Sequence, residues 1–223
     1  MFEKNITAKK ILKGLTREEL RELARKDETT TEYGSASYVT KIRSRSKKQT
    51  YIVDAGYPIG VRQQTMPVEK AKALVQEVQN YLKDKEVIQV DRTMGMNKDY
   101  TLACRLFITK DYARIANEWH TSLFPPQANR EPDLVSVYVP EWPERVIFTN
   151  PAQGWTYILG SDYFGEAKKS FLRKAMYDIK MKHGGIGLHA GSKLVRARGV
   201  DGKMREVGFI MFGLSGTGKT SLT

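Results

Sequence analysis

Residues Gly213-Leu-Ser-Gly-Thr-Gly-Lys-Thr220 follow the pattern G-x-x-x-x-G-K-[ST], the signature of a phosphate-binding loop. Its glycines let consecutive backbone N–H groups converge on phosphate oxygens, with the positive end of a following helix behind them. The apolar run 206–212 predicts a buried strand that enters the loop. We therefore predict nucleotide binding by Gly213, Leu214, Ser215, Gly216, Thr217, Gly218, Lys219, Thr220 and Ser221.

In such a loop Lys219 reaches the β- and γ-phosphates and Thr220 holds Mg²⁺. A Gly/Ser-rich turn is the alternative, but it would have to produce this lysine and threonine by chance. Only three residues follow Thr220 in the sequence, too few for the helix and acidic strand that complete a nucleotide domain. We expect the N-terminal part of a longer enzyme, inactive by itself, whose nucleotide site is completed by a further domain or a second chain.

The composition narrows the class of partner. The 37 basic and 25 acidic residues give a formal charge of +12, which favours anionic partners. The basic residues, many of them between 168 and 182, are dispersed and form neither a long Lys/Arg block nor an interleaved aromatic platform, so we expect solvated helix faces and no nucleic-acid site. The single cysteine, Cys104, lies in an apolar strand pattern and predicts a structural thiol. No apolar run approaches the ~18 residues of a membrane span, and no secretory signal is present, so we expect a cytoplasmic protein.

Helix and strand patterns alternate along the chain. A capping box at Thr16 and Glu19 predicts a helix over 17–26, and apolar periodicity predicts helices over 67–83 and 110–123. Strand patterns occupy 37–42, 51–54, 87–92, 101–109, 134–139, 145–148 and 155–159. The order predicts an α/β fold with a mixed sheet. We place a substrate-binding domain at 1–204 and the start of an incomplete P-loop domain at 205–223.

Two further segments carry candidate functional residues. Gly160-Ser-Asp-Tyr-Phe-Gly-Glu-Ala-Lys-Lys-Ser170 lies between a strand and a long helix, where α/β proteins bind anions. Residues 186–189 predict a short strand that ends in His189. A lone histidine is more often structural than a ligand, but this one lies between the lysine pair and the phosphate loop in a glycine-rich setting. We therefore favour a functional role for it.

The order of these parts resembles the ATP-dependent phosphoenolpyruvate carboxykinases, whose phosphate loop normally carries the same eight residues as 213–220. A second family motif lies at 160–170, at the right separation from the phosphate loop. It matches at Tyr163, Gly165, Glu166, Lys168, Lys169 and Ser170. The resemblance is firm from about 155 to 223. It implies conversion of oxaloacetate and ATP to phosphoenolpyruvate, carbon dioxide and ADP, with Mn²⁺ and Mg²⁺ as cofactors.

The resemblance also implies roles for single residues. Lys169 and His189 would be ligands of Mn²⁺, with Lys168 as neighbouring positive charge, and Tyr163 would lie beside the phosphoenolpyruvate and carbon dioxide site. Residues 44–53 look like the family's G-R-S-P-K-D-K-Y-I-V segment, which makes Arg45 the candidate for binding a substrate carboxylate; a solvated basic loop is the alternative. The candidate catalytic residues are thus Arg45, Tyr163, Lys168, Lys169 and Lys219.

The chain departs from the family pattern in two places. Residues 189–193 read His-Ala-Gly-Ser-Lys in place of His-Cys-Ser-Ala-Asn, and 160–162 read Gly-Ser-Asp in place of Gly-Gly-Thr, which indicates a divergent member. Another P-loop phosphotransferase, of the HPr-kinase type or a small-molecule kinase, would explain 213–220 but not Tyr163, Lys169 or His189. A non-catalytic anion-binding paralogue is the third hypothesis, and it would leave apolar surface near 209–212 uncovered.

Overall fold

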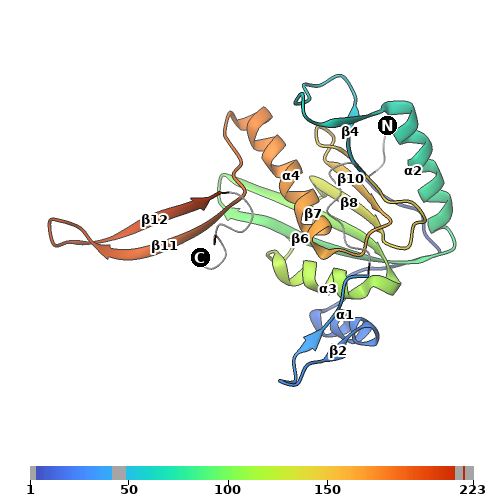
Figure 1. Cartoon of the computed structure of the whole chain (residues 1–223), viewed down its shortest axis with the longest axis horizontal. Helices are drawn as coiled ribbons and strands as arrows, with labels where there is room; N and C mark the ends of the chain where they lie inside the picture. The colour runs from blue at the N-terminus through green and yellow to red at the C-terminus, as the bar shows by residue number, and fades with distance from the viewer. Residues whose placement is uncertain (1–3, 42–48, 214–217, 219–223) are drawn as a thin grey trace. The chain divides into compact units, whose positions relative to one another are not determined.

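The computed structural model describes residues 4–41, 49–213 and 218, which divide into compact units at 1–178 and 179–223 (Figure 1). The helices are α1 (Arg17–Ala24), α2 (Val68–Leu82), α3 (Ala113–Ser122) and α4 (Phe164–His183), with short 3₁₀ helices η1 (Arg25–Asp27) and η3 (Lys110–Tyr112). The strands are β1 (Lys10–Leu12), β2 (Thr29–Thr30), β3 (Ala36–Ser37), β4 (Thr50–Asp54), β5 (Gln64–Pro67), β6 (Glu86–Asn97), β7 (Tyr100–Thr109), β8 (Leu134–Val139), β9 (Val146–Asn150), β10 (Trp155–Leu159), β11 (Ala190–Arg198) and β12 (Met204–Phe212).

The first unit is built on an eight-stranded sheet in the order β1-β6-β7-β8-β10-β9-β4-β5. Strands β7, β8 and β10 run parallel, whereas β6 is antiparallel to β7 and β9 is antiparallel to β10. The sheet is therefore mixed, and the predicted α/β class with a mixed sheet is confirmed. Every residue of β8 and β10 is buried, as expected for central strands that are covered on both faces.

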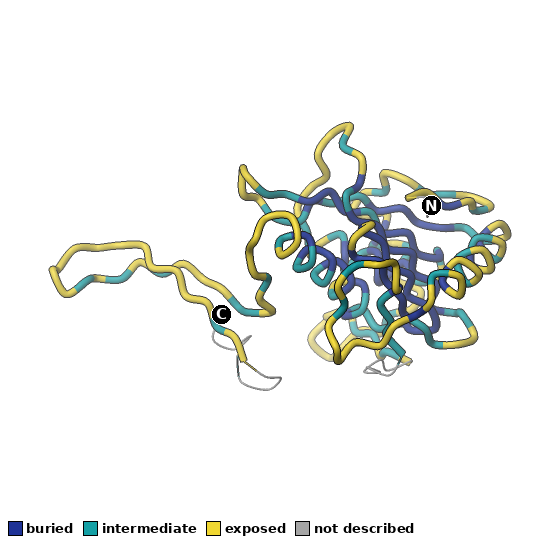
Figure 2. Tube along the Cα trace, turned by 90° about the horizontal axis from the view of Figure 1, so that it is seen from above, coloured by how far each residue is buried: buried dark blue, intermediate teal, exposed yellow. Residues whose placement is uncertain are grey.

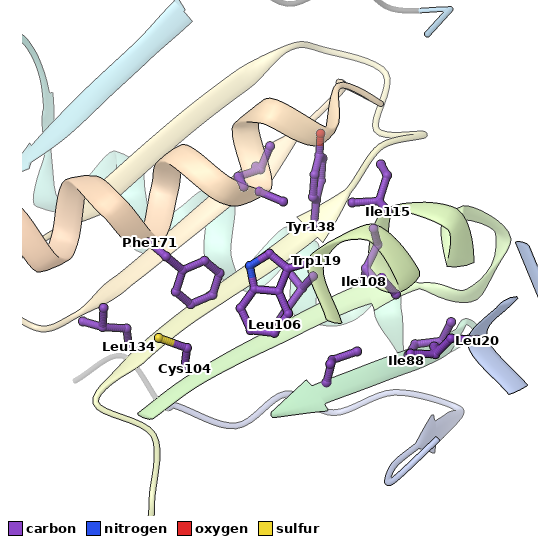
Figure 3. Close-up of a cluster of buried hydrophobic side chains, with 14 of the residues drawn as sticks. Leu20, Ile88, Cys104, Leu106, Ile108, Ile115, Trp119, Leu134, Tyr138 and Phe171 are labelled. Carbon is purple, nitrogen blue, oxygen red and sulfur yellow. The ribbon is translucent and has the colours of Figure 1, made fainter. Parts of the chain in front are cut away.

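Each face of the sheet carries its own hydrophobic core. Successive strand residues point to opposite faces, so Leu106 belongs to one core and Phe107 to the other. Helices α1, α3 and α4 cover the first face, where Phe171 of α4 lies beside Trp119 of α3 with ring centroids 4.8 Å apart (Figure 3). Helix α2 covers the second face. Cys104 is buried in the first core, which confirms the prediction of a structural thiol.

One predicted strand in this unit was wrong over most of its length, and another is confirmed but longer than predicted. The predicted strand at 37–42 is limited to β3, which ends at Ser37, because Tyr38 and Lys41 are held by a side chain of a distant turn rather than by a strand ladder. The predicted strand at 87–92 continues to Asn97 because it pairs with β7 almost to the tip of the hairpin. Within the described residues no helix combines the length and apolar content needed to span a membrane.

The second unit holds an antiparallel hairpin in which Ala190 pairs with Phe212 and Arg198 pairs with Met204. The strand predicted at 206–212 is confirmed as part of β12, but its predicted burial is wrong for the described residues. Phe209, Ile210 and Phe212 are 47%, 60% and 71% exposed, because β12 pairs only with β11 in the part of the chain that is described (Figure 2). An apolar strand with a single partner strand leaves both of its faces without a covering layer.

Candidate active site

The candidate site is the turn between β10 and α4. Because β8 and β10 are parallel, their carboxyl ends, Val139 and Leu159, lie at the same edge of the sheet. Gly160 leaves β10 with φ of 65°, and its N–H donates to Val139 O at 3.1 Å. A Cβ on Gly160 would lie 2.5 Å from Glu144 O, so only glycine fits both this conformation and this close approach. The turn therefore begins with a fixed direction at the edge where α/β folds bind ligands.

The next residues bring Tyr163 and Lys169 together. Lys169 lies about one and a half helical turns into α4, and its Nζ is 5.4 Å from the centroid of the Tyr163 ring. The ring lies against the first turn of the helix because Gly165 has no side chain: a Cβ there would come 2.4 Å from Tyr163 Cε1. Lys168 is exposed, and its Nζ is 5.7 Å from the centroid of a different ring, that of Phe164. The two predicted catalytic lysines thus contact different aromatic rings.

A buried ionic cluster supports the turn from behind. Arg114 of α3 donates from Nη2 to the backbone oxygen of Asp162 at 2.6 Å and lies 3.5 Å from its carboxylate. The same carboxylate accepts from the Tyr38 hydroxyl at 2.9 Å and from the Lys41 backbone N–H at 3.0 Å. Burial raises the pKa of the Tyr38 phenol, so this hydroxyl remains a donor. A cavity of about 420 Å³ opens beside the cluster and is lined by Lys26, Asp27, Tyr38, Lys41, Asp111, Tyr112 and Asp162.

The inner face of α4 is joined to β8 by polar contacts. Lys174 is completely buried, and its Nζ donates to Val135 O at 2.5 Å and to Ser136 Oγ at 2.9 Å. Ser136 and Ser170 share a hydrogen bond of 2.9 Å between their hydroxyls. Burial lowers the pKa of the Lys174 amine well below its ordinary value. The sequence interpretation of residues 168–182 as solvated was therefore wrong for Lys174, which lies on the same helical face as the core residue Phe171.

His189 belongs to the second unit. It does not end a strand, as the sequence predicted: residues 184–189 form an irregular link and β11 starts at Ala190, where pairing with Phe212 begins. The glycines at 184, 185 and 187 disfavour an extended strand there. Because Ala190 and Phe212 are partners, His189 and Gly213 lie at the same end of the hairpin. His189 is exposed, so its imidazole is open to a ligand.

The remaining predicted residues are only partly described. Arg45, Leu214, Ser215, Gly216, Thr217, Lys219, Thr220 and Ser221 lie outside the described residues. Gly218 has φ of 80°, a conformation that side chains rarely adopt and that glycine in a tight loop allows. Among the residues that the structure describes, no group of three or more His, Cys, Asp and Glu could hold a metal ion. The roles assigned to these residues stay predictions.

Comparison with known proteins gives the family. A family model described as phosphoenolpyruvate carboxykinase matches residues 9–223, nearly the whole chain. The chain belongs to the phosphoenolpyruvate carboxykinase family. The resemblance inferred from the motifs at 160–170 and 213–220 is thereby confirmed, and the match extends well before residue 155 into the sheet of the first unit.

Several relatives are named phosphoenolpyruvate carboxykinase (ATP). One from Aeropyrum pernix is 36% identical over 197 residues, covering 86% of this chain and 37% of the relative. One from Brevibacillus brevis is 28% identical over 220 residues, covering 86% and 38%. One from Thermus thermophilus is 30% identical over 179 residues, covering 70% and 31%. The chain thus spans less than two fifths of the length of these carboxykinases.

Sequence reasoning missed the contacts of three residues: Arg114 and Asp162, which support the turn between β10 and α4, and Lys174, which joins α4 to β8. The sequence assigned Arg114 to a predicted helix, Asp162 to the anion-binding turn and to a departure from the family pattern, and Lys174 to a solvated helix face. Their partners are 38 to 124 residues away in the chain, so no local pattern could reveal the contacts. The helical spacing of Lys174 from Phe171 and Ala167 is the one sequence signal that could have indicated its burial.

Proposed function

We propose that the complete protein containing this chain converts oxaloacetate and ATP to phosphoenolpyruvate, carbon dioxide and ADP. The observation that carries the proposal is the pairing of Tyr163 and Lys169 on a rigidly held turn at the carboxyl edge of the sheet, in a chain of the carboxykinase family. The names of the relatives support ATP as the nucleotide. A cytoplasmic location and a domain boundary at 204/205 stay predictions.

The reaction breaks a C–C bond and forms a P–O bond. Carbon dioxide leaves oxaloacetate, its bonding electron pair forms an enolate, and the enolate oxygen attacks the γ-phosphorus of ATP while ADP leaves. The chain must therefore bind two anionic substrates side by side and stabilise the negative charge that develops on the enolate oxygen. In this proposal Arg45 binds a carboxylate, Tyr163 borders the organic substrate, and the charge of Lys219 stabilises the phosphoryl group in transfer.

The donor chemistry also fits divalent cations. His189 offers an exposed imidazole and Lys169 a partly exposed amine, both of which are nitrogen ligands for Mn²⁺ once deprotonated, and Thr220 offers a hydroxyl to Mg²⁺. When bound, the cations would supply electrostatic stabilisation of developing negative charge. The positive net charge of +12 favours binding of two anionic substrates.

The proposal is tested in the complete protein with ATP, oxaloacetate and Mn²⁺. Lys219→Ala should lower the rate of phosphoenolpyruvate formation by at least about 100-fold, because it removes the cation beside the transferred phosphoryl group. Lys203→Ala, an exposed lysine between β11 and β12, is the matched control and should retain the wild-type rate. A Lys219→Ala variant that works at the normal rate would overturn the assignment. ATP turnover that does not depend on oxaloacetate, with transfer of the phosphoryl group to another acceptor, would favour a different phosphotransferase.

A further inference from the structure

Asp162 is the centre of a buried hydrogen-bond network that joins three segments distant in sequence. Its side chain is 2% exposed and that of Arg114 is 4% exposed. The carboxylate of Asp162 accepts from Tyr38 and Lys41, which follow β3, and Arg114 reaches it from the first turn of α3. The Arg114 guanidinium lies 3.2 Å from the centroid of the Tyr38 ring. Arg114 and Tyr38, which both contact the Asp162 carboxylate, therefore also contact each other.

The cluster also fixes the backbone on both sides of Tyr163. Arg114 holds the carbonyl oxygen that precedes Tyr163, and the Tyr138 hydroxyl donates to the carbonyl oxygen of Tyr163 itself at 2.9 Å. Ser161 Oγ accepts from the Tyr163 N–H at 3.3 Å. Because both peptide groups around Tyr163 are held by side chains of α3 and β8, the two backbone torsions of Tyr163 have little freedom.

The charges in the cluster favour a single arrangement. Arg114 is buried between Asp162 and Glu118, whose carboxylate lies 3.6 Å from Arg114 Nη1. A buried guanidinium requires a negative partner, and Asp162 is the only acidic residue among those described that contacts both this guanidinium and the Tyr38–Lys41 segment. Neutralising Asp162 would leave Arg114 with the more exposed Glu118 and would weaken the hydrogen bonds donated by Tyr38 and Lys41, because an uncharged acceptor binds donors less strongly than a carboxylate.

We propose that Asp162 is a positioning residue for the reaction: with Arg114 it sets the backbone of Tyr163 and holds residues 38–41 beside the substrate turn. In this proposal the buried Asp162 acts without touching substrate. Its effect on turnover is exerted through Tyr163. The kinetic part of this inference rests on the proposed function, whereas the structural part, the hydrogen bond from Lys41 N–H to the carboxylate, can be measured without any activity.

The test uses Asp162→Asn and Tyr38→Phe in the complete protein, with Tyr33→Phe as the matched control, because Tyr33 lies between β2 and β3 and is 86% exposed. Hydrogen exchange of peptides covering residues 39–41 should be about tenfold faster or more in Asp162→Asn and unchanged in Tyr33→Phe. The kcat/KM for oxaloacetate should fall by about 10- to 100-fold in Asp162→Asn and less in Tyr38→Phe, while the KM for ATP stays within about twofold.

Each result of the exchange and kinetic measurements either supports or overturns the proposal. Unchanged exchange at 39–41 in a folded Asp162→Asn variant would overturn the network. Faster exchange with unchanged oxaloacetate kinetics would overturn the positioning role, and equal losses for ATP and oxaloacetate would indicate a merely structural role. If Asp162→Asn does not fold, the same two measurements, hydrogen exchange at 39–41 and oxaloacetate kinetics, are made on Tyr38→Phe, which removes only one hydroxyl. A wild-type protein without carboxykinase activity would refute the proposed function, and the exchange result would still test the network.

Discussion

Replacement of Gly165 by alanine should lower the activity of the protein while leaving its stability nearly unchanged. The added Cβ would lie 2.4 Å from Tyr163 Cε1, 2.5 Å from Cζ and 2.7 Å from the hydroxyl oxygen. Carbon atoms in contact are normally separated by about 3.5–4.0 Å, so the ring must move by about 1 Å or rotate away. Tyr163 is only partly buried, and its ring can therefore move without disrupting either core.

The magnitudes of the two effects differ. Alanine is favoured over glycine inside a helix by up to about 1 kcal/mol, which offsets part of the cost of moving the ring, so the free energy of unfolding should change by no more than about 1 kcal/mol. A displacement of about 1 Å in a substrate-positioning group lowers turnover by about 100-fold, equivalent to about 2.7 kcal/mol. We therefore expect a folded protein with normal thermal stability and a kcat/KM for oxaloacetate reduced by about two orders of magnitude.

The assay is steady-state formation of phosphoenolpyruvate, with thermal unfolding as the stability measurement. Gly60→Ala is the control, because a Cβ at Gly60 would meet only Gln63 Cγ, at an ordinary 3.8 Å. In a Tyr163→Ala background, Gly165→Ala should have little further effect, because the ring that the methyl group displaces is absent. Full activity of Gly165→Ala, or an equal loss in both backgrounds, would refute the reasoning that this glycine acts through the ring.

Three further predictions concern the core. Phe171→Ala should lower the free energy of unfolding by about 3–5 kcal/mol in chemical denaturation, whereas the fully exposed Val61→Ala should change it by less than about 0.5 kcal/mol; similar values for the two would contradict the assigned core. Burial lowers the pKa of Lys174 in the folded state well below 10.5, so the unfolded state binds more protons at pH values between the folded-state pKa and 10.5. Wild-type stability should therefore have a component that rises with pH over this interval, up to about pH 10. Lys174→Met should lack that component, and identical pH dependence of unfolding in the two proteins would count against a buried, neutral amine. Burial raises the pKa of the Cys104 thiol to about 12, so a maleimide at neutral pH should label it only as fast as the protein unfolds; rapid labelling of the native protein is the contrary result.

Local patterns in the sequence predicted most of the helices and central strands. The capping box at Thr16 and Glu19 is present, with both reciprocal hydrogen bonds, at the start of α1. The apolar run 134–139 is the fully buried strand β8. In these cases the signal and the structure involve the same few neighbouring residues, so a pattern in the chain is enough to predict them.

Contacts between distant segments could not be predicted in this way. Nothing near Asp162 in the sequence indicates that its carboxylate accepts from Tyr38, 124 residues earlier. The exposure of Phe209 was missed for a related reason: an apolar run predicts a buried strand, but its burial depends on which other elements pack against it. Of the predicted site residues, Tyr163 and Lys169 are brought together, His189 lies at the same end of its hairpin as Gly213, and Arg45 is outside the described residues.

The measurement that tests the central claim most directly is ³¹P NMR of the complete protein incubated with ATP, oxaloacetate and Mn²⁺. Carboxykinase activity predicts a phosphoenolpyruvate resonance that grows in step with ADP and is absent when oxaloacetate is omitted. Growth of ADP together with inorganic phosphate, and no phosphoenolpyruvate, would contradict the account, since it would show that this chain's phosphate loop serves a reaction other than phosphoryl transfer to the enolate.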